Sequence, residues 1–222
     1  MSQRTALETA LVRDRWLVGG SLAFAVLLCW AWIVPMALDM YGTMSGPSAW
    51  MMSPARGVGH HAMLFAMWAV MMCGMMLPSA APAILIYAAV VRRSGDGHDA
   101  APRAYLFAAG YLAVWTLFSA AATAVQGVLT ALTLVSPMME VTRPALGSAL
   151  LIGAGLYQMT PLKQSCLQSC RSPAAFITQH WRAGRRGAWR MGVEHGLYCL
   201  GCCWPLMLLL FVGGVMSLLC IA

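Results

Sequence analysis

The chain has 222 residues, of which 60% are hydrophobic and only 9% are charged, and its formal net charge is +7. A soluble domain has roughly a quarter of its residues charged, so this composition excludes an ordinary soluble protein and is typical of a membrane protein. The sequence also lacks a phosphate-binding glycine loop, a nucleophile with its base, and paired catalytic carboxylates, which argues against the common enzyme classes.

Five apolar runs are long enough to cross a hydrocarbon layer about 30 Å thick, which takes roughly 20 helical residues. In chain order, we expect membrane-spanning helices at approximately 16–38, 62–91, 104–126, 145–162 and 191–221. The predicted fold class is therefore all-α, with residues 1–222 forming one polytopic transmembrane helix bundle.

The basic residues predict the orientation of this bundle, because cytoplasmic flanks of membrane helices collect Lys and Arg. With the N-terminus in the cytoplasm, all lysines and arginines except Arg56 and Arg143 fall on the inner side. We therefore expect a multi-pass protein of the bacterial cytoplasmic (inner) membrane. Its positive charge is explained by the membrane topology and by contact with anionic lipid, so we expect no nucleic-acid partner.

The expected outer loop, residues 39–61, is rich in Gly, Pro and Ser and carries four methionines together with His60 and His61. Such a segment is either a collector of copper ions or a polar interface whose Met and Trp side chains touch lipid headgroups. Cys29, Cys73 and Cys220, which lie in apolar runs, are interpreted as packing residues.

The second predicted helix carries methionines in four-residue steps, which places them on adjacent ribbons of one helix. The four nearest its middle are Met71, Met72, Met75 and Met76. Thioethers favour Cu(I), although a methionine stripe can equally be core packing.

The expected inner loop, residues 163–190, holds Cys166 and Cys170, which face one way if this segment turns as a helix. Lys163 and Arg171 nearby favour the thiolate form. Because the cytoplasm is reducing, a structural disulfide is disfavoured there, and we expect a metal or redox role for this pair.

The last predicted helix contains the segment EHGLYCLGCC, whose His195, Cys199 and Cys202 fall within about 80° of one another, with Cys203 just to one side. Thiolates and imidazole together suit a soft metal, with Cu(I) favoured and zinc or no metal as alternatives. One helix supplies only two or three ligands, so the others must come from elsewhere. The methionines of the second helix lie at a similar depth.

Glu194 precedes this cluster and is expensive in a membrane helix unless it is paired. It either orients His195 as a hydrogen-bond partner behind the metal ligands, or it pairs with Arg190 four residues earlier. The sequence leaves both interpretations open.

Four segments carry a family resemblance: MWAVMMCGMMLPSAAP, GYLAVWTLFS, GLYQMTPLKQSCLQSCRSP and GLYCLGCCWPLMLLLFVGGVMSL. With these the chain resembles the bacterial family of predicted metal-binding integral membrane proteins that carries domain of unknown function 2182. The resemblance implies a metal-binding membrane protein and points to Met71, Met72, Met75, Met76, Cys166, Cys170, Cys202 and Cys203. Members of that family continue past GVMSL into a further helix, so we expect this contribution to be absent or supplied by a partner.

The leading hypothesis is a membrane protein that binds copper for transport, delivery or tolerance. An enzyme is the less favoured class. One alternative is a membrane thiol oxidoreductase that uses the C-x-x-C pair Cys199 and Cys202. Another is a non-catalytic subunit or assembly factor of a larger membrane metalloenzyme complex, whose small-residue helices support close packing with that enzyme or with further copies of the chain.

Overall fold

The computed structural model describes residues 2–40, 42, 57–94, 99–136 and 141–215, with side chains described from residue 16 onward. Its secondary structure in these ranges is helical, apart from one isolated antiparallel bridge between Val135 and Val141. The helices are α1 (Ser2–Met40), α3 (Val58–Arg93), α4 (Ala100–Ala131), α5 (Pro144–Gln158), α6 (Pro161–Arg171), α7 (Pro173–Gln179), α8 (Gly184–Leu208) and α9 (Leu210–Gly213). The all-α prediction is confirmed for this part of the chain.

In the described residues, four stretches of helix are long and apolar enough to cross a membrane: Trp16–Met40, Val58–Arg93, Ala100–Ala131 and Gly184–Gly213. The bent pair α5 and α6 makes a fifth if it is counted as one span. This agrees with the expected number of about five. Most of the expected loop 39–61, and the last residues of the expected helix 191–221, lie outside the described residues.

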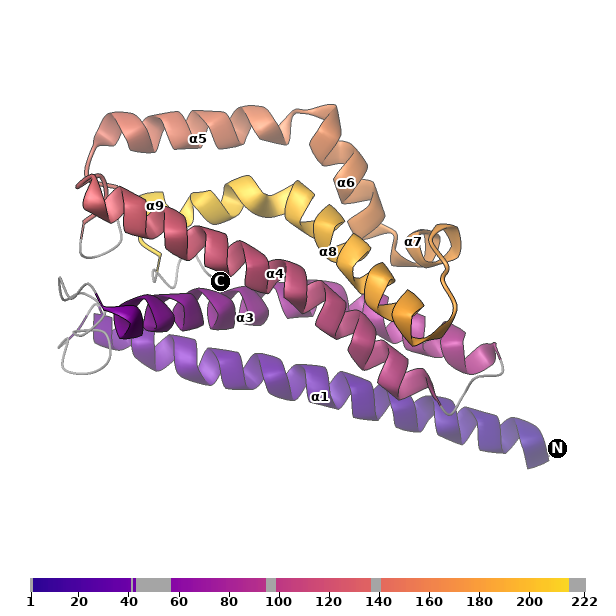
Figure 1. Ribbon diagram of the computed structural model, residues 1–222. Helices are drawn as coiled ribbons and strands as arrows, with labels where there is room; N and C mark the ends of the chain where they lie inside the picture. Colours follow the sequence, from indigo (N-terminus) through magenta and orange to yellow (C-terminus); the bar gives the residue numbers. More distant parts are fainter. Residues whose placement is uncertain (1, 41, 43–56, 95–98, 137–140, 216–222) are drawn as a thin grey trace.

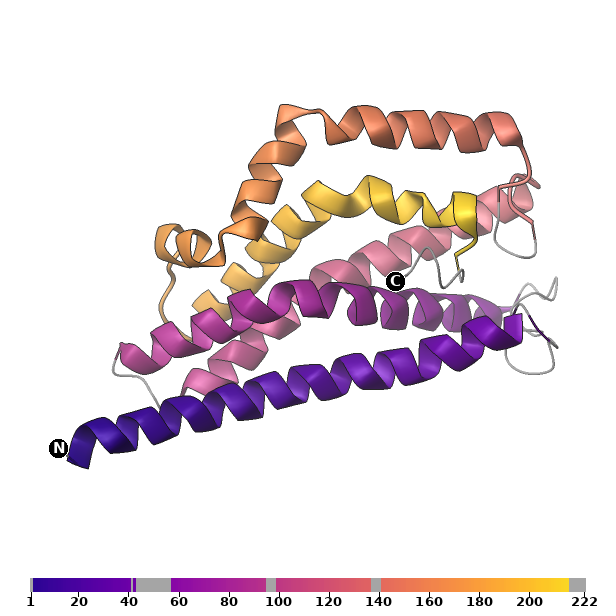
Figure 2. The ribbon, with the colours of Figure 1, turned by 180° about the vertical axis from the view of Figure 1, so that it is seen from behind.

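The helices pack in a fixed order around α4 (Figures 1 and 2). One side of α4 lies against α8 and another against α3, while α1 covers the outer side of α3. The large side chains that fill the interior are fully buried and include Trp68, Tyr87, Phe107, Tyr111 and Trp115. By contrast, α5 lies along the top of Figure 1 and touches α8 only lightly.

Two glycines bring α4 and α8 into backbone contact. A Cβ atom at Gly110 would collide with the Trp189 carbonyl, and one at Gly192 would collide with the Phe107 carbonyl. Small residues at such crossings let helix backbones approach closely, which is how helices associate where lipid removes the hydrophobic driving force. This crossing fixes the position of Tyr111, which follows Gly110 on α4, relative to Cys199, which lies two turns after Gly192 on α8.

Prolines set where the helices of the second half begin. Pro144, Pro161 and Pro173 each occupy the first turn of a helix, where a missing N–H costs nothing. Thr160 before Pro161 is extended, as the residue before proline prefers, and its side chain accepts a hydrogen bond from the Lys163 N–H at 3.4 Å. The result is a 67° bend between α5 and α6.

The structure differs from the sequence prediction in residues 163–190, which were expected to form a loop. This segment contains most of α6, all of α7 and the start of α8. The predicted helix 145–162 correspondingly ends at Gln158. The prediction relied on long apolar runs, which identify only helices that suit lipid. α6 is too polar to form such a run.

Candidate metal centre

Three cysteine thiols from two helices meet where α6 packs against α8. The sulfur atoms of Cys170, Cys199 and Cys202 all lie within 4.8 Å of one another. The Sγ atoms of Cys202 and Cys170 are 3.9 Å apart. Cys199 and Cys202 are buried and Cys170 is half-buried, so the cluster is shielded and one of its members is reachable from outside.

The α8 backbone orients the thiols that follow Cys199. The Cys202 thiol donates to the Cys199 carbonyl at 3.1 Å, and the Cys203 thiol donates to the same oxygen at 2.8 Å. The Cys203 thiol also interacts with the thiols of Cys199 and Cys202. The group of described residues with ligand atoms within 4.8 Å of one another contains Cys170, Cys199 and Cys202 but not Cys203. Cys203 is therefore a neighbour of the three-thiol cluster.

Cys166 stands one turn before Cys170 and determines how close α6 comes to α8. Its Sγ lies 2.8 Å from the position that a Cβ atom would occupy on residue 201. Because residue 201 is glycine, α6 settles against α8 next to Cys202. Cys166 is therefore a flanking thiol, and its packing brings Cys170 into the cluster.

A proline in α8 provides a second connection between these elements. Pro205 lacks the N–H that would bond to the Gly201 carbonyl, and in an apolar surrounding that carbonyl needs another partner. The Tyr157 hydroxyl, at the end of α5, donates to it. The end of α5 is thereby fixed to α8 one residue before Cys202.

Tyr111 connects α3 and α4 to the cluster. Its hydroxyl donates to the Met76 carbonyl at 3.0 Å and lies 3.2 Å from the Cys199 sulfur. Ser79 donates to the same Met76 carbonyl at 2.7 Å. Sequence analysis did not single out Tyr111; the only signal was a hydroxyl in an otherwise apolar stretch, which in lipid needs a partner.

The predicted methionine ribbon lies in the bundle interior. Met71 and Met72 are fully buried, Met76 is 8% exposed and Met75 is half-buried. The hydrogen bonds of the described residues connect Met76 to the cluster through its main-chain carbonyl and Tyr111. Metal binding by the four methionine sulfurs stays a prediction.

His195 lies one turn before Cys199 on α8, and is 3% exposed. Its ring packs between those of Phe107, Tyr111 and Phe176, with centroid distances of 5.8, 5.8 and 5.1 Å. Its Nδ1 atom is buried without a hydrogen-bond partner among the described residues. Its ring nitrogens are not in the group of ligand atoms within 4.8 Å, so the structure places His195 beside the three thiols.

Glu194 pairs with a residue that the sequence did not indicate. Its Oε1 atom is 2.7 Å from the Arg182 guanidinium. Arg182 precedes α8, and its backbone N–H also bonds to the Met191 sulfur at 3.4 Å. Glu194 thus ties the segment before α8 to the third turn of that helix. Its partner is neither of the two that the sequence suggested, Arg190 and His195.

A family model described as PpoB2, copper chaperone, matches residues 65–222. The chain belongs to this family. No curated protein and no solved structure matches the chain. The match bears out the expected relation to a metal-related family, under a different family name from the one that the sequence motifs resemble.

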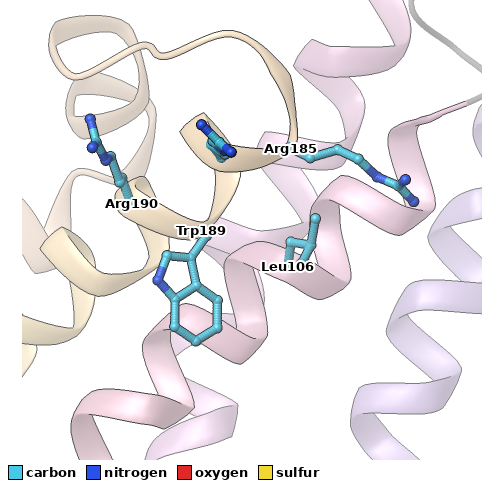
Figure 3. Close-up of a pocket in the computed structure, with 5 residues that line it drawn as sticks. Leu106, Arg185, Trp189 and Arg190 are labelled. Atoms are coloured by element: carbon cyan, nitrogen blue, oxygen red, sulfur yellow. The ribbon is translucent and has the colours of Figure 1, made fainter.

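The segment that matches the copper chaperone family contains α4 to α9, nearly all of α3, and the three clustered cysteines, whereas α1 lies before it. It also contains a surface hollow of about 280 Å³ at the start of α8, lined by Leu106, Arg185, Arg186, Trp189 and Arg190 (Figure 3). Arginine, tryptophan and leucine side chains offer no soft metal ligand. Of these two features of the described residues, the thiol cluster is the one that fits the copper of the family description.

Proposed function

We propose that the protein is an integral membrane copper chaperone that holds one Cu(I) ion as cargo between Cys170, Cys199 and Cys202. The observation that carries the proposal is three thiols within 4.8 Å of one another in a chain of the copper chaperone family. Thiolates select soft ions such as Cu(I). Among the described residues no fourth ligand atom joins this group within 4.8 Å, so the group is short of the four ligands that close a structural zinc site.

Binding follows from the arrangement of the thiols. Because thiolates are the ligands, the entering ion displaces thiol protons, and the oxidation state of copper does not change. When the Cys199 sulfur becomes negative, the Tyr111 hydroxyl, 3.2 Å away, turns its proton from the Met76 carbonyl to that sulfur, and the carbonyl keeps the Ser79 hydroxyl as its donor. Cys203 and Cys166 flank the centre and offer sulfurs for stepwise exchange with an acceptor protein.

The proposed location is the bacterial cytoplasmic membrane, with the N-terminus inside. This is supported by the basic end of the bundle, where α3 ends and α4 and α8 begin (Figure 1). That end carries Arg92, Arg93, Arg103, Arg185, Arg186 and Arg190. Reporter fusions after residues 94 and 136 test the orientation: an alkaline phosphatase reporter should be active only at 136, and activity at 94 would reverse it.

The test of the cargo site is copper stoichiometry in the purified full-length chain, loaded with Cu(I) under reducing conditions. We expect Cys170→Ser/Cys199→Ser/Cys202→Ser to lose one equivalent of copper, measured by elemental analysis. Cys220→Ser, which removes a cysteine with no predicted role, is the matched control and should keep it. Unchanged copper in the triple variant would exclude this centre.

The same preparations separate the alternatives that the sequence left open. A thiol oxidoreductase should show a disulfide between Cys199 and Cys202, or between Cys202 and Cys170, in membranes alkylated at once after lysis. An assembly factor should co-purify with a stable partner and without stoichiometric copper. The proposed chaperone should show neither, since its cysteines must stay reduced to bind Cu(I).

A further inference from the structure

Two more cysteines face each other across the contact between α1 and α3. Cys29 and Cys73 are free, half-buried thiols that are close enough to interact with each other. α1 approaches α3 here because residue 74 is glycine. A Cβ atom on Gly74 would lie 3.1 Å from the Cys29 Cβ and 3.2 Å from the Ile33 Cδ1. Helix packing therefore holds the two thiols together.

Few metal ions suit a site made of two thiols. Two thiols in an apolar surrounding are too few for zinc, which takes four ligands in closed sites. Calcium and magnesium require oxygen ligands, and two thiols provide none. Cu(I) is soft and is satisfied by two thiolates in a line, so it is the ion that suits two facing cysteines.

The position of the pair relates it to the three-thiol centre. Cys73 and Met76 are neighbours on the surface of α3, three residues apart. The Met76 carbonyl accepts from Tyr111, whose hydroxyl lies 3.2 Å from the Cys199 sulfur. α3 therefore contributes Cys73 to the pair on its α1 side and the Met76 carbonyl to the contact with Tyr111 on its α4 side.

The pair is also independent of the family match. Cys73 lies inside the matched segment 65–222, but Cys29 lies before it. The match therefore provides no assignment for a site that needs both residues.

We propose that Cys29 and Cys73 form a second Cu(I) site with two thiolate ligands, from which the ion passes along the α3 methionines to Cys170, Cys199 and Cys202. One Cu(I) replaces the two thiol protons, which are released, and no electron is transferred. The direction of passage rests on the proposed function, whereas the binding of copper by the pair does not.

Copper stoichiometry tests the pair, using Cu(I) alone as the probe on the full-length chain. We expect two equivalents in the wild type, one in Cys29→Ser/Cys73→Ser, one in Cys170→Ser/Cys199→Ser/Cys202→Ser, and none when all five are replaced. If the double variant binds as much as the wild type while the triple variant loses one equivalent, the second site is wrong and the proposed function stands. The reverse result would overturn the proposed function alone.

X-ray absorption at the copper edge gives a second criterion that does not depend on how the double variant folds. In the triple variant, which leaves the pair intact, the remaining copper should show two sulfur ligands and the edge feature of two-coordinate Cu(I). In the double variant, the remaining copper should show three sulfurs. A triple variant that binds no copper, or binds it with three or more ligands, would overturn the second site.

Discussion

The sulfur atoms of Cys170 and Cys202 lie 3.9 Å apart, although the two residues are 32 positions apart in the chain and belong to different helices. The contact exists because α6 turns back at a 67° bend and lies along α8. Copper binding should therefore depend on the packing of α6 against α8 as much as on the cysteines themselves.

Gly201→Ala should displace α6 without removing a ligand. The new Cβ atom would lie 2.8 Å from the Cys166 sulfur, so unless that thiol turns to another rotamer, α6 moves away and carries Cys170 with it. We expect copper to lose one of its three sulfur ligands, detected by X-ray absorption in a Cys29→Ser/Cys73→Ser background. Gly155→Ala is the control, since nothing lies within 4 Å of that position. Three sulfur ligands on copper in Gly201→Ala would mean that the added methyl group is accommodated without displacing Cys170.

Tyr157→Phe should leave the Gly201 carbonyl without a partner, because Pro205 offers no N–H. An unsatisfied buried polar group costs about 1–3 kcal/mol. We expect a lower thermal unfolding temperature in detergent. Tyr105→Phe is matched to it: its hydroxyl makes an exposed contact with Ser21, and the change should cost less than about 0.5 kcal/mol. Equal effects in the two variants would contradict the role given to Tyr157.

Tyr111→Phe removes the hydroxyl next to the Cys199 sulfur but no metal ligand. A hydrogen bond to a charged group contributes about 1.5–3 kcal/mol, so Cu(I) affinity should fall by about tenfold or more. Competition with a Cu(I) chelator measures this. The Tyr87 hydroxyl is buried without a hydrogen-bond partner among the described residues, so Tyr87→Phe should leave the affinity unchanged. If both variants bind copper equally well, Tyr111 does not support the centre.

Gly192→Ala should disrupt the crossing of α4 and α8, since its Cβ atom would collide with the Phe107 carbonyl. Backbone cannot yield as a side chain can, and we expect a loss of about 2 kcal/mol or more in stability. Gly153→Ala on α5, with open space around it, should gain up to about 1 kcal/mol from helix propensity. Thermal unfolding of the two variants should shift in opposite directions, and a stable Gly192→Ala protein would show that the crossing adapts.

Much of the bundle could be predicted from the sequence because lipid-crossing helices need long apolar runs. The proximity of Cys199 and Cys202 followed in the same way from three-residue spacing on one helix. What the sequence could not provide was the partner of each helix face. Glu194 accepts a hydrogen bond from Arg182, twelve residues earlier, because the segment before α8 lies alongside that helix. Helical spacing alone points to Arg190.

The thiol pair of Cys29 and Cys73 illustrates the same limit. Each residue is a single cysteine in an apolar run, which by itself indicates packing. Only the contact between α1 and α3 at Gly74 shows that the two lie together. The association of Cys170 with α8 was equally invisible, because polar α6 was expected to be part of a loop.

α6 has eleven residues, none of them buried, and it carries one of the three sulfurs. The other two belong to α8, which is anchored by its crossing with α4. Elements with few buried contacts are the first to open. If Cu(I) binds these three sulfurs as proposed, an acceptor that draws α6 aside would lower the coordination from three to two and take the copper without unfolding the bundle.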